Sequence, residues 1–221
     1  MKVSGSEHMA LDCELFEKYE SGQTKDTLRL YSWDPPCISL GYSQKIEEEV
    51  DVDRAKRLGW DVVRRPTGGG IVFHNEAEVT YSLITGIDQL PAGLIPSYKK
   101  ISEAVVLGLR KLGLKAEINK INVERRALNV GLCFSYPAEY EIVVGGRKIV
   151  GSAQKRGRHA LLQQGSIFVR PNGKGIFSVL KRYHEDEMSI SVEEILGRSV
   201  GFDELKHALC IGFKKGLGIE I

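Results

Sequence analysis

The chain has few cysteines, and their spacing is not that of a metal site or a redox motif. The four cysteines stand at positions 13, 37, 133 and 210 of 221 residues, with no CxxC pair and no closely placed histidine pair. A zinc site is therefore not expected. Residues 1–8 are too polar for a secretion signal, which favours a cytoplasmic location where the cysteines stay as thiols.

Long apolar runs and a dominant charge are also missing. No apolar stretch approaches the roughly 20 residues that cross a bilayer, so no membrane partner is expected. The 31 lysines and arginines exceed the 29 aspartates and glutamates by only two, which gives no global signature of nucleic-acid binding. A charged partner would have to meet a local patch. One such patch contains Lys155, Arg156 and Arg158, with no carboxylate nearby in the sequence.

The chain does have the composition of a single globular domain spanning residues 1–221, because 42% of its residues are hydrophobic. Its hydrophobic periodicity predicts strands over 28–33, 37–40, 61–65, 71–73, 79–84, 115–118, 140–144, 147–150 and 161–169. The same patterns predict helices over 8–20, 51–59, 96–112, 175–183 and 203–215, and one that begins at residue 191. Asp51 can cap the second of these helices, and Ser191 and Glu194 have the spacing of a capping box. The C-terminal segment 175–221 is therefore expected to be a small helical part of the domain.

A tight hairpin is predicted around residues 145–146. Both residues are glycines, which suit the positive backbone angles of a two-residue turn between two strands. This turn places Val143 opposite Lys148 and Ile142 opposite Ile149.

Two interpretations of Lys148 follow from this hairpin. In the first, Lys148 forms a cross-strand ion pair with Glu141, which lies diagonal to it. In the second, Lys148 stabilises a thiolate at Cys133, which precedes the hairpin in the sequence. A neighbouring cation lowers the pKa of a cysteine, and the thiolate is the nucleophilic form. A lone cysteine is otherwise most often a small buried hydrophobe.

Three consecutive glycines, Gly68, Gly69 and Gly70, lie between two predicted strands, with Arg65 before them and His74 after them. Such a run lets the backbone approach a ligand closely. It is not a P-loop or a dinucleotide-binding motif, because a strand follows it rather than a Gly-Lys-Ser sequence and a helix. Three roles of this glycine run remain open: phosphate binding, contact with an acyl chain, and a simple tight turn. His74, taken alone, is more often structural than catalytic.

Several motifs together resemble the lipoate-protein ligase and octanoyltransferase superfamily. They occur in the same order at residues 9–12, 64–74, 81–83, 146–154 and 162–167. Cys133, Pro137 and residues 146–154 are most similar to the Gram-positive type of octanoyl-[acyl-carrier-protein]:protein N-octanoyltransferase. The resemblance implies an α/β domain of the α+β kind, with a central, largely antiparallel mixed sheet and flanking helices, like the catalytic domain of biotin and lipoate protein ligases.

The resemblance also implies an activity. Cys133 would attack the thioester of octanoyl-acyl carrier protein, and a lysine of a lipoyl domain, such as the glycine cleavage H protein, would then accept the octanoyl group. Lys148 would lower the Cys133 pKa. No cofactor is implied, because a thioester is already activated. The substrate-binding residues implied are Arg65, Gly68, Gly69, Gly70, His74, Gly151, Ser152 and Ala153.

Gly70 keeps a second activity open, because it resembles the ligases, whereas many octanoyltransferases of this type carry arginine there. An ATP-dependent lipoate or octanoate ligase is therefore the main competing activity. Fewer than fifty residues follow Gly175, which is small for the accessory domain of a full-length ligase, so a ligase would need a partner chain. An amidotransferase acting between lipoyl proteins and a non-catalytic binder of lipoyl domains also remain open.

Overall fold

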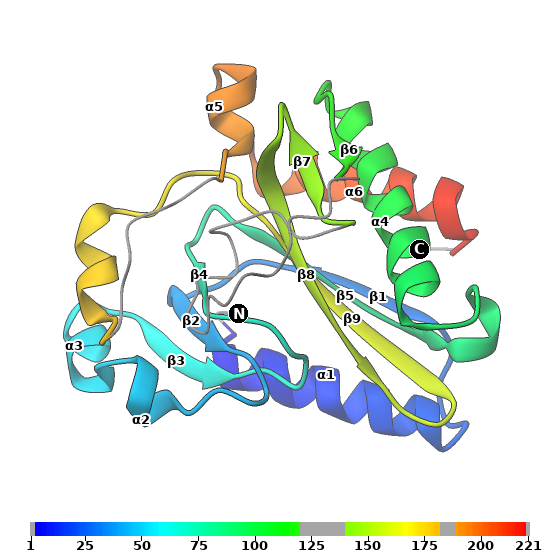
Figure 1. Ribbon diagram of the computed structural model, residues 1–221, viewed down its shortest axis with the longest axis horizontal. Coiled ribbons are helices and arrows are strands. Elements are labelled where there is room, and N and C mark those ends of the chain that lie inside the picture. The colour runs from blue at the N-terminus through cyan, green and yellow to red at the C-terminus, as the bar shows by residue number, and fades with distance from the viewer. Residues whose placement is uncertain (1–2, 120–139, 182–188, 220–221) are drawn as a thin grey trace.

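The centre of the molecule is a six-stranded antiparallel sheet with the strand order β1-β5-β9-β8-β7-β6 (Figure 1). The computed structural model describes residues 3–119, 140–181 and 189–219. The strands of this sheet are β1 (Thr27–Tyr31), β5 (Val79–Gly86), β9 (Ala160–Ile167), β8 (Arg147–Arg156), β7 (Ile142–Val144) and β6 (Glu117–Ile118). The predicted fold class, with a largely antiparallel central sheet and flanking helices, is confirmed.

A second, three-stranded sheet has the order β3-β2-β4, and it is the mixed one. Strand β2 (Cys37–Leu40) pairs in parallel with β3 (Asp61–Arg64) and antiparallel with β4 (Val72–His74). Its apolar side packs against short helical segments. These are α2 (Ile46–Glu49), α3 (Val52–Arg57), which begins at the predicted cap Asp51, and the 3-10 segment η2 (Lys174–Val179).

Two long helices cover one face of the six-stranded sheet (Figure 1). They are α4 (Leu94–Lys111) and α6 (Phe202–Leu217), and they cross where glycines remove side chains from the interface. A Cβ atom on Gly212 would lie 2.4 Å from the Ala104 carbonyl oxygen, so only glycine allows this approach. Helix α5 (Val192–Leu196) begins with the predicted capping box of Ser191 and Glu194.

Helix α1 (Gly5–Glu20) lies on the opposite face of the sheet, where Phe16 packs against Ile84 and Leu162. Side chains alternate between the two faces of a strand. On β5 and β9 this alternation places mainly apolar residues on the α4 and α6 side. The α1 side carries apolar residues and also four polar ones: Thr80, Ser82, Gln164 and Ser166. A short 3-10 turn, η1 (Ile87–Gln89), follows β5. Within the described ranges, no helix has the length and apolar character needed to cross a membrane.

Several local predictions differ from the structure, among them the strand predicted over 147–150, which continues as β8 to Arg156. Ile142 pairs with Val150 rather than with Ile149, because a bulge shifts the register next to Val143, which does pair with Lys148. The segment predicted as a helix over 175–183 is the 3-10 turn η2, and residues 182–188 lie outside the described part of the chain. Helix α4 begins at Leu94, two residues before the predicted start.

Candidate functional site

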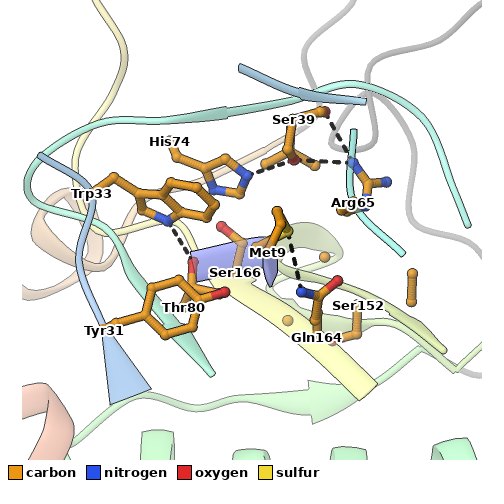
Figure 2. Close-up of a pocket in the computed structure, with 14 residues that line it drawn as sticks. Met9, Tyr31, Trp33, Ser39, Arg65, His74, Thr80, Ser152, Gln164 and Ser166 are labelled. Carbon is orange, nitrogen blue, oxygen red and sulfur yellow. Dashed lines mark hydrogen bonds between the residues drawn. The ribbon is translucent and has the colours of Figure 1, made fainter. Parts of the chain in front are cut away.

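A pocket lies between the two sheets and the N-terminal half of α1 (Figure 2). It holds about 360 Å³ of empty space, part of it open to solvent. Met9, Trp33 and Val72 give it apolar surface. Polar side chains also line it, and they come from strands far apart in the sequence: Ser39, Arg65, His74, Thr80, Gln164 and Ser166.

Small residues on β8 form the floor of this pocket. Gly151 pairs with Ser166, and Ala153 pairs with Gln164, so these four residues share the pocket face. Glycine and alanine leave open the volume that a larger side chain would fill. Ser152 also lines the pocket, so the structure brings the predicted segment 151–153 into the site.

Arg65 organises the glycine loop from within the protein. Its Nη2 donates to the carbonyl oxygens of Gly68 and Gly70, each at 2.7 Å, and its Nη1 donates to the Ser39 carbonyl oxygen at 3.0 Å. Charge-assisted hydrogen bonds of this kind fix a loop that has no side chains of its own. Arg65 lines the pocket, and these bonds hold residues 68–70 in place. Its predicted role in substrate binding stays a prediction.

The loop also approaches the end of β2 closely. A Cβ atom on Gly41 would lie 2.0 Å from the Gly69 carbonyl oxygen, and Gly69 itself has φ +92°. Only glycines allow this backbone contact without strain.

A chain of buried hydrogen bonds crosses the pocket wall. Trp33 Nε1 donates to Thr80 Oγ1 at 2.8 Å, and Thr80 Oγ1 donates to Glu78 Oε1 at 3.0 Å. The same carboxylate oxygen lies 2.5 Å from His74 Nδ1, and His74 Nε2 lies 2.7 Å from Ser39 Oγ. The Trp33 indole stacks on the His74 ring at 4.1 Å, which fixes the plane of the imidazole.

A second network closes the pocket beside α1. The fully buried Asp12 accepts hydrogen bonds from Arg29 and from Gln164 Nε2, the latter at 2.6 Å. Thr67 Oγ1 donates to Gln164 Oε1 at 2.8 Å, so the glycine loop and α1 are joined through one amide. Burial and the Asp12 charge raise the pKa of Tyr31 well above its ordinary value, so this phenol stays protonated.

Lys148 is almost fully buried, at 1% exposure, and its Nζ donates to Glu141 Oε1 at 2.5 Å. The cross-strand ion pair predicted from the hairpin is therefore present. Cys133 lies outside the described residues, so the second interpretation, a thiolate stabilised by Lys148, stays a prediction. Lys148 does not line the pocket, whereas His74 and residues 151–153 do.

Cysteines and acidic residues elsewhere form no further centre within the described ranges. Cys13, Cys37 and Cys210 are free thiols. Burial raises the pKa of the Cys37 thiol far above its ordinary value, which keeps it unreactive. In the part of the chain that the structure describes, no three histidine, cysteine, aspartate or glutamate residues gather as metal ligands would.

The basic patch predicted around residue 156 lies near the turn between β8 and β9, beside the end of α1. Lys155 Nζ sits 4.6 Å above the Phe16 ring, and Arg156 Nη1 donates to Ser97 Oγ at 2.9 Å. Lys155 and Arg156 therefore have partners within the protein, while Arg158 is exposed.

Sequence reasoning missed most of the polar lining of the pocket. Trp33, Ser39 and Glu78 received no role, although residues 9–12 and 162–167 were among the motifs. The signal was present in the strands: Thr80 and Ser166 are hydroxyl residues that alternate with apolar ones in segments buried on both faces. Buried polar residues at that spacing indicate a lined cavity rather than a packed core.

Comparison with known proteins gives a consistent result. The family model described as the lipoyl protein ligase A/B catalytic domain matches residues 4–214. The octanoyltransferase LipM of Kyrpidia tusciae is 38% identical over 236 residues, which cover 100% of this chain and 86% of that protein.

Solved structures agree. The crystal structure of a lipoate-protein ligase A bound with ATP superimposes with a TM-score of 0.79 and 29% identity, covering 100% of this chain and 85% of that one. A bipartite lipoate protein ligase from Thermoplasma acidophilum was solved in a study that includes its E2 lipoyl domain. It superimposes with a TM-score of 0.74 and 27% identity, covering 100% of this chain and 83% of that one. The resemblance seen in the motifs is confirmed, and the chain belongs to the lipoyl protein ligase A/B catalytic domain family.

Proposed function

We propose that the chain is an acyltransferase of lipoate biosynthesis that transfers an octanoyl group from octanoyl-acyl carrier protein to a lysine of a lipoyl domain. The glycine cleavage H protein is one such acceptor. The observation that carries this proposal is the similarity to an octanoyltransferase over the whole chain. That similarity supports octanoyl transfer, and the donor and acceptor are the finer part of the proposal.

The pocket supports an acyl substrate of medium length. Its apolar surface from Met9, Trp33 and Val72, above the small residues of β8, suits an alkyl chain. Burying the seven apolar carbons of an octanoyl group is worth roughly 6 kcal/mol, at about 0.8 kcal/mol for each methylene. This energy would hold the acyl group while carrier and acceptor proteins exchange.

The proposed chemistry passes through a thioester on Cys133. The thiolate attacks the carbonyl carbon of the incoming thioester, the carrier thiol leaves, and the lysine amine of the acceptor then displaces Cys133 to form an amide. We assign Lys148 the role of lowering the Cys133 pKa. The Glu141 carboxylate would orient the Lys148 ammonium in its buried position, and it would also offset part of its charge.

Intact mass after mixing the protein with octanoyl-acyl carrier protein tests this mechanism. We expect one octanoyl adduct that disappears in Cys133→Ala and persists in Cys13→Ala, a matched change at a half-buried cysteine in α1. A protein without an adduct, or an adduct that survives Cys133→Ala, would contradict the thioester. Adding an apo lipoyl domain should then remove the adduct and octanoylate the domain. Octanoyl transfer only from an octanoylated H protein would instead identify an amidotransferase.

A ligase is the second candidate, favoured by Gly70 and by the structural similarity to a lipoate-protein ligase bound with ATP. It would activate free lipoate or octanoate with ATP. Formation of an acyl-adenylate from ATP and the free acid would establish this activity, and its absence with an active octanoyl-carrier reaction would exclude it.

A further inference from the structure

Three buried side chains in the pocket wall have the arrangement of a nucleophile with its base and an orienting carboxylate. His74 Nε2 lies 2.7 Å from Ser39 Oγ, and His74 Nδ1 lies 2.5 Å from Glu78 Oε1. The exposed fractions of the three residues are 1% for Ser39, 4% for His74 and 1% for Glu78. Ser39 and His74 face the pocket (Figure 2). The thioester mechanism above gives none of them a reacting role.

The fold brings these residues together through strand pairing. Cys37 pairs with His74 on β2 and β4, so Ser39, two residues further along β2, is a diagonal neighbour of His74 on the same face of the small sheet. Glu78 immediately precedes β5 of the large sheet. The cluster therefore joins the two sheets. Ser39 and His74 are 35 residues apart in the sequence, so their spacing gives no sign of the contact.

One arrangement of the protons in this cluster suits general-base catalysis and fits the contacts. With Glu78 Oε1 as the acceptor, His74 Nδ1 carries the hydrogen. In the tautomer whose Nε2 is unprotonated, the Ser39 hydroxyl donates to that nitrogen. Arg65 Nη1 donates to Ser39 Oγ at 3.1 Å, which satisfies the oxygen and places a cation beside it. This is the order of donors needed for a histidine to act as general base on a serine.

The pocket also holds an unused hydroxyl. Ser166 Oγ is buried, faces the pocket and makes no hydrogen bond among the described atoms. A buried hydroxyl without a partner costs free energy unless a ligand supplies an acceptor. A purely alkyl chain would leave Ser166 unpaired, whereas an acyl carbonyl oxygen placed deep in the pocket would accept from it.

We propose that Ser39, His74 and Glu78 hydrolyse medium-chain acyl esters and thioesters in this pocket, independently of Cys133. The substrate class rests on the proposed acyl-binding function of the pocket. Ser39 Oγ attacks the acyl carbonyl carbon and its proton passes to His74 Nε2, while Glu78 accepts from Nδ1 of the resulting imidazolium. The proton then moves to the leaving alkoxide or thiolate. Water attacks the acyl-serine, gives its proton to His74, and releases the acid as the proton returns to Ser39.

The test uses Cys133→Ala, which removes the proposed thioester route. This protein is incubated with p-nitrophenyl octanoate and, separately, with an alkyl fluorophosphonate that labels activated serines. We expect ester hydrolysis above the buffer rate and one phosphonyl adduct at Ser39, located by peptide mass. A second change, Ser39→Ala, should remove the adduct and lower kcat/KM at least about 100-fold, since removing a triad member typically costs more than that.

Two further variants separate catalysis from structure. Glu78→Gln keeps the shape of the carboxyl group but removes its charge, and should lower hydrolysis at least about 10-fold. Ser102→Ala is the matched control. Ser102 is an equally buried serine in α4, and its side chain has no hydrogen-bond partner among the described residues. This change should leave both hydrolysis and labelling unchanged. Thermal unfolding of each variant shows that it is folded.

The outcomes distinguish this inference from the proposed function. A folded Cys133→Ala protein without a Ser39 adduct, or with hydrolysis that survives Ser39→Ala, overturns the serine nucleophile and leaves octanoyl transfer by the intact chain unaffected. Labelling at Ser39 in a chain that forms no octanoyl adduct at Cys133 would support the nucleophile and remove the thioester proposal.

Discussion

The two faces of the six-stranded sheet differ in the side chains that the same strands place on them. Toward α4 and α6, β5 and β9 present apolar side chains that belong to the main core: Val79, Tyr81, Leu83, Leu161 and Ile167. Toward α1 and the small sheet, half of the intervening positions on these strands are polar, and three of them line the pocket: Thr80, Gln164 and Ser166. The first face is a packed interior, while the second combines a lined cavity with the packing of α1.

The difference shows where the stability and the binding chemistry reside. The helix face buries apolar surface with little polar content, so it provides most of the favourable free energy of folding. The pocket face keeps three buried oxygens without hydrogen-bond partners among the described residues: Ser82 Oγ, Ser166 Oγ and Glu78 Oε2. Such groups reduce stability and are retained where a ligand uses them. Substitutions on the two faces should therefore separate stability from activity.

The largest expected effect is on the helix face. Phe213→Ala should lower the free energy of unfolding by about 3–5 kcal/mol, because Phe213 is fully buried and its ring packs edge-on against Tyr81 at 5.3 Å. Denaturant unfolding measures this loss, and Leu107→Ala, at an exposed position of α4, should change it far less. Octanoyl transfer by the folded fraction should stay close to wild type. A fall in kcat/KM as large as that of a pocket variant would contradict the separation of the two faces.

A pH effect comes next, again on the helix face. Burial raises the pKa of Tyr81 to about 12, compared with about 10 in an unfolded chain. Above pH 10 the unfolded state loses its proton first, so stability is complete below pH 10 and falls as the pH rises to about 12. Two pKa units correspond to roughly 3 kcal/mol as an upper limit.

Tyr81→Phe should therefore make the loss of unfolding free energy between pH 10 and 12 less steep. Tyr19, whose pKa burial also raises to about 12, contributes a residual slope in both proteins. Denaturant unfolding at several alkaline pH values measures the difference. Identical slopes for the variant and the parent protein would show that Tyr81 ionises normally in the folded state.

A substitution at the boundary between the two faces should affect both stability and octanoyl transfer. A Cβ atom on Gly165 would lie 2.2 Å from the Tyr81 ring, opposite Ser152 of the pocket. Gly165→Ala should cost about 1–3 kcal/mol and also lower octanoyl transfer, because the displaced ring moves the β8 floor. Gly173→Ala, where nothing lies within 4 Å, is the matched control. Equal unfolding free energies for the two variants would show that the ring moves without cost.

The smallest effect on stability is expected within the pocket, where the effect on substrate binding should be the clearest. Thr80→Val leaves the Trp33 indole N–H without its acceptor and should cost about 1–2 kcal/mol, since the open pocket lets water replace part of the bond. The KM for the octanoyl donor should rise because Trp33 and His74 lose their fixed stack. Thr85→Val, a buried threonine on the same strand, is the control. Comparable KM changes in both variants would argue against a role specific to the pocket.

Local structure was largely predictable from the sequence, because it depends on neighbouring residues. The strand at 37–40, the cap at Asp51, the capping box at Ser191 and the turn at residues 145–146 all follow from spacing and turn chemistry. The pairing of Ile142 with Val150 was missed, since a bulge depends on how β7 fits β6 and β8 together. The short η2 turn was missed because packing against the small sheet overrides local helical preference.

The sequence by itself determined most of the elements and the family resemblance. It also indicated the ion pair between Lys148 and Glu141 as one of two interpretations, because their seven-residue separation spans one hairpin. It also singled out the glycine loop and residues 151–153 as parts of one site. Only the tertiary structure decided that Arg65 holds that loop and that Ser39, His74 and Glu78 meet in the pocket wall. Those contacts depend on how two separate sheets pack against each other, and no periodicity within a single segment encodes that arrangement.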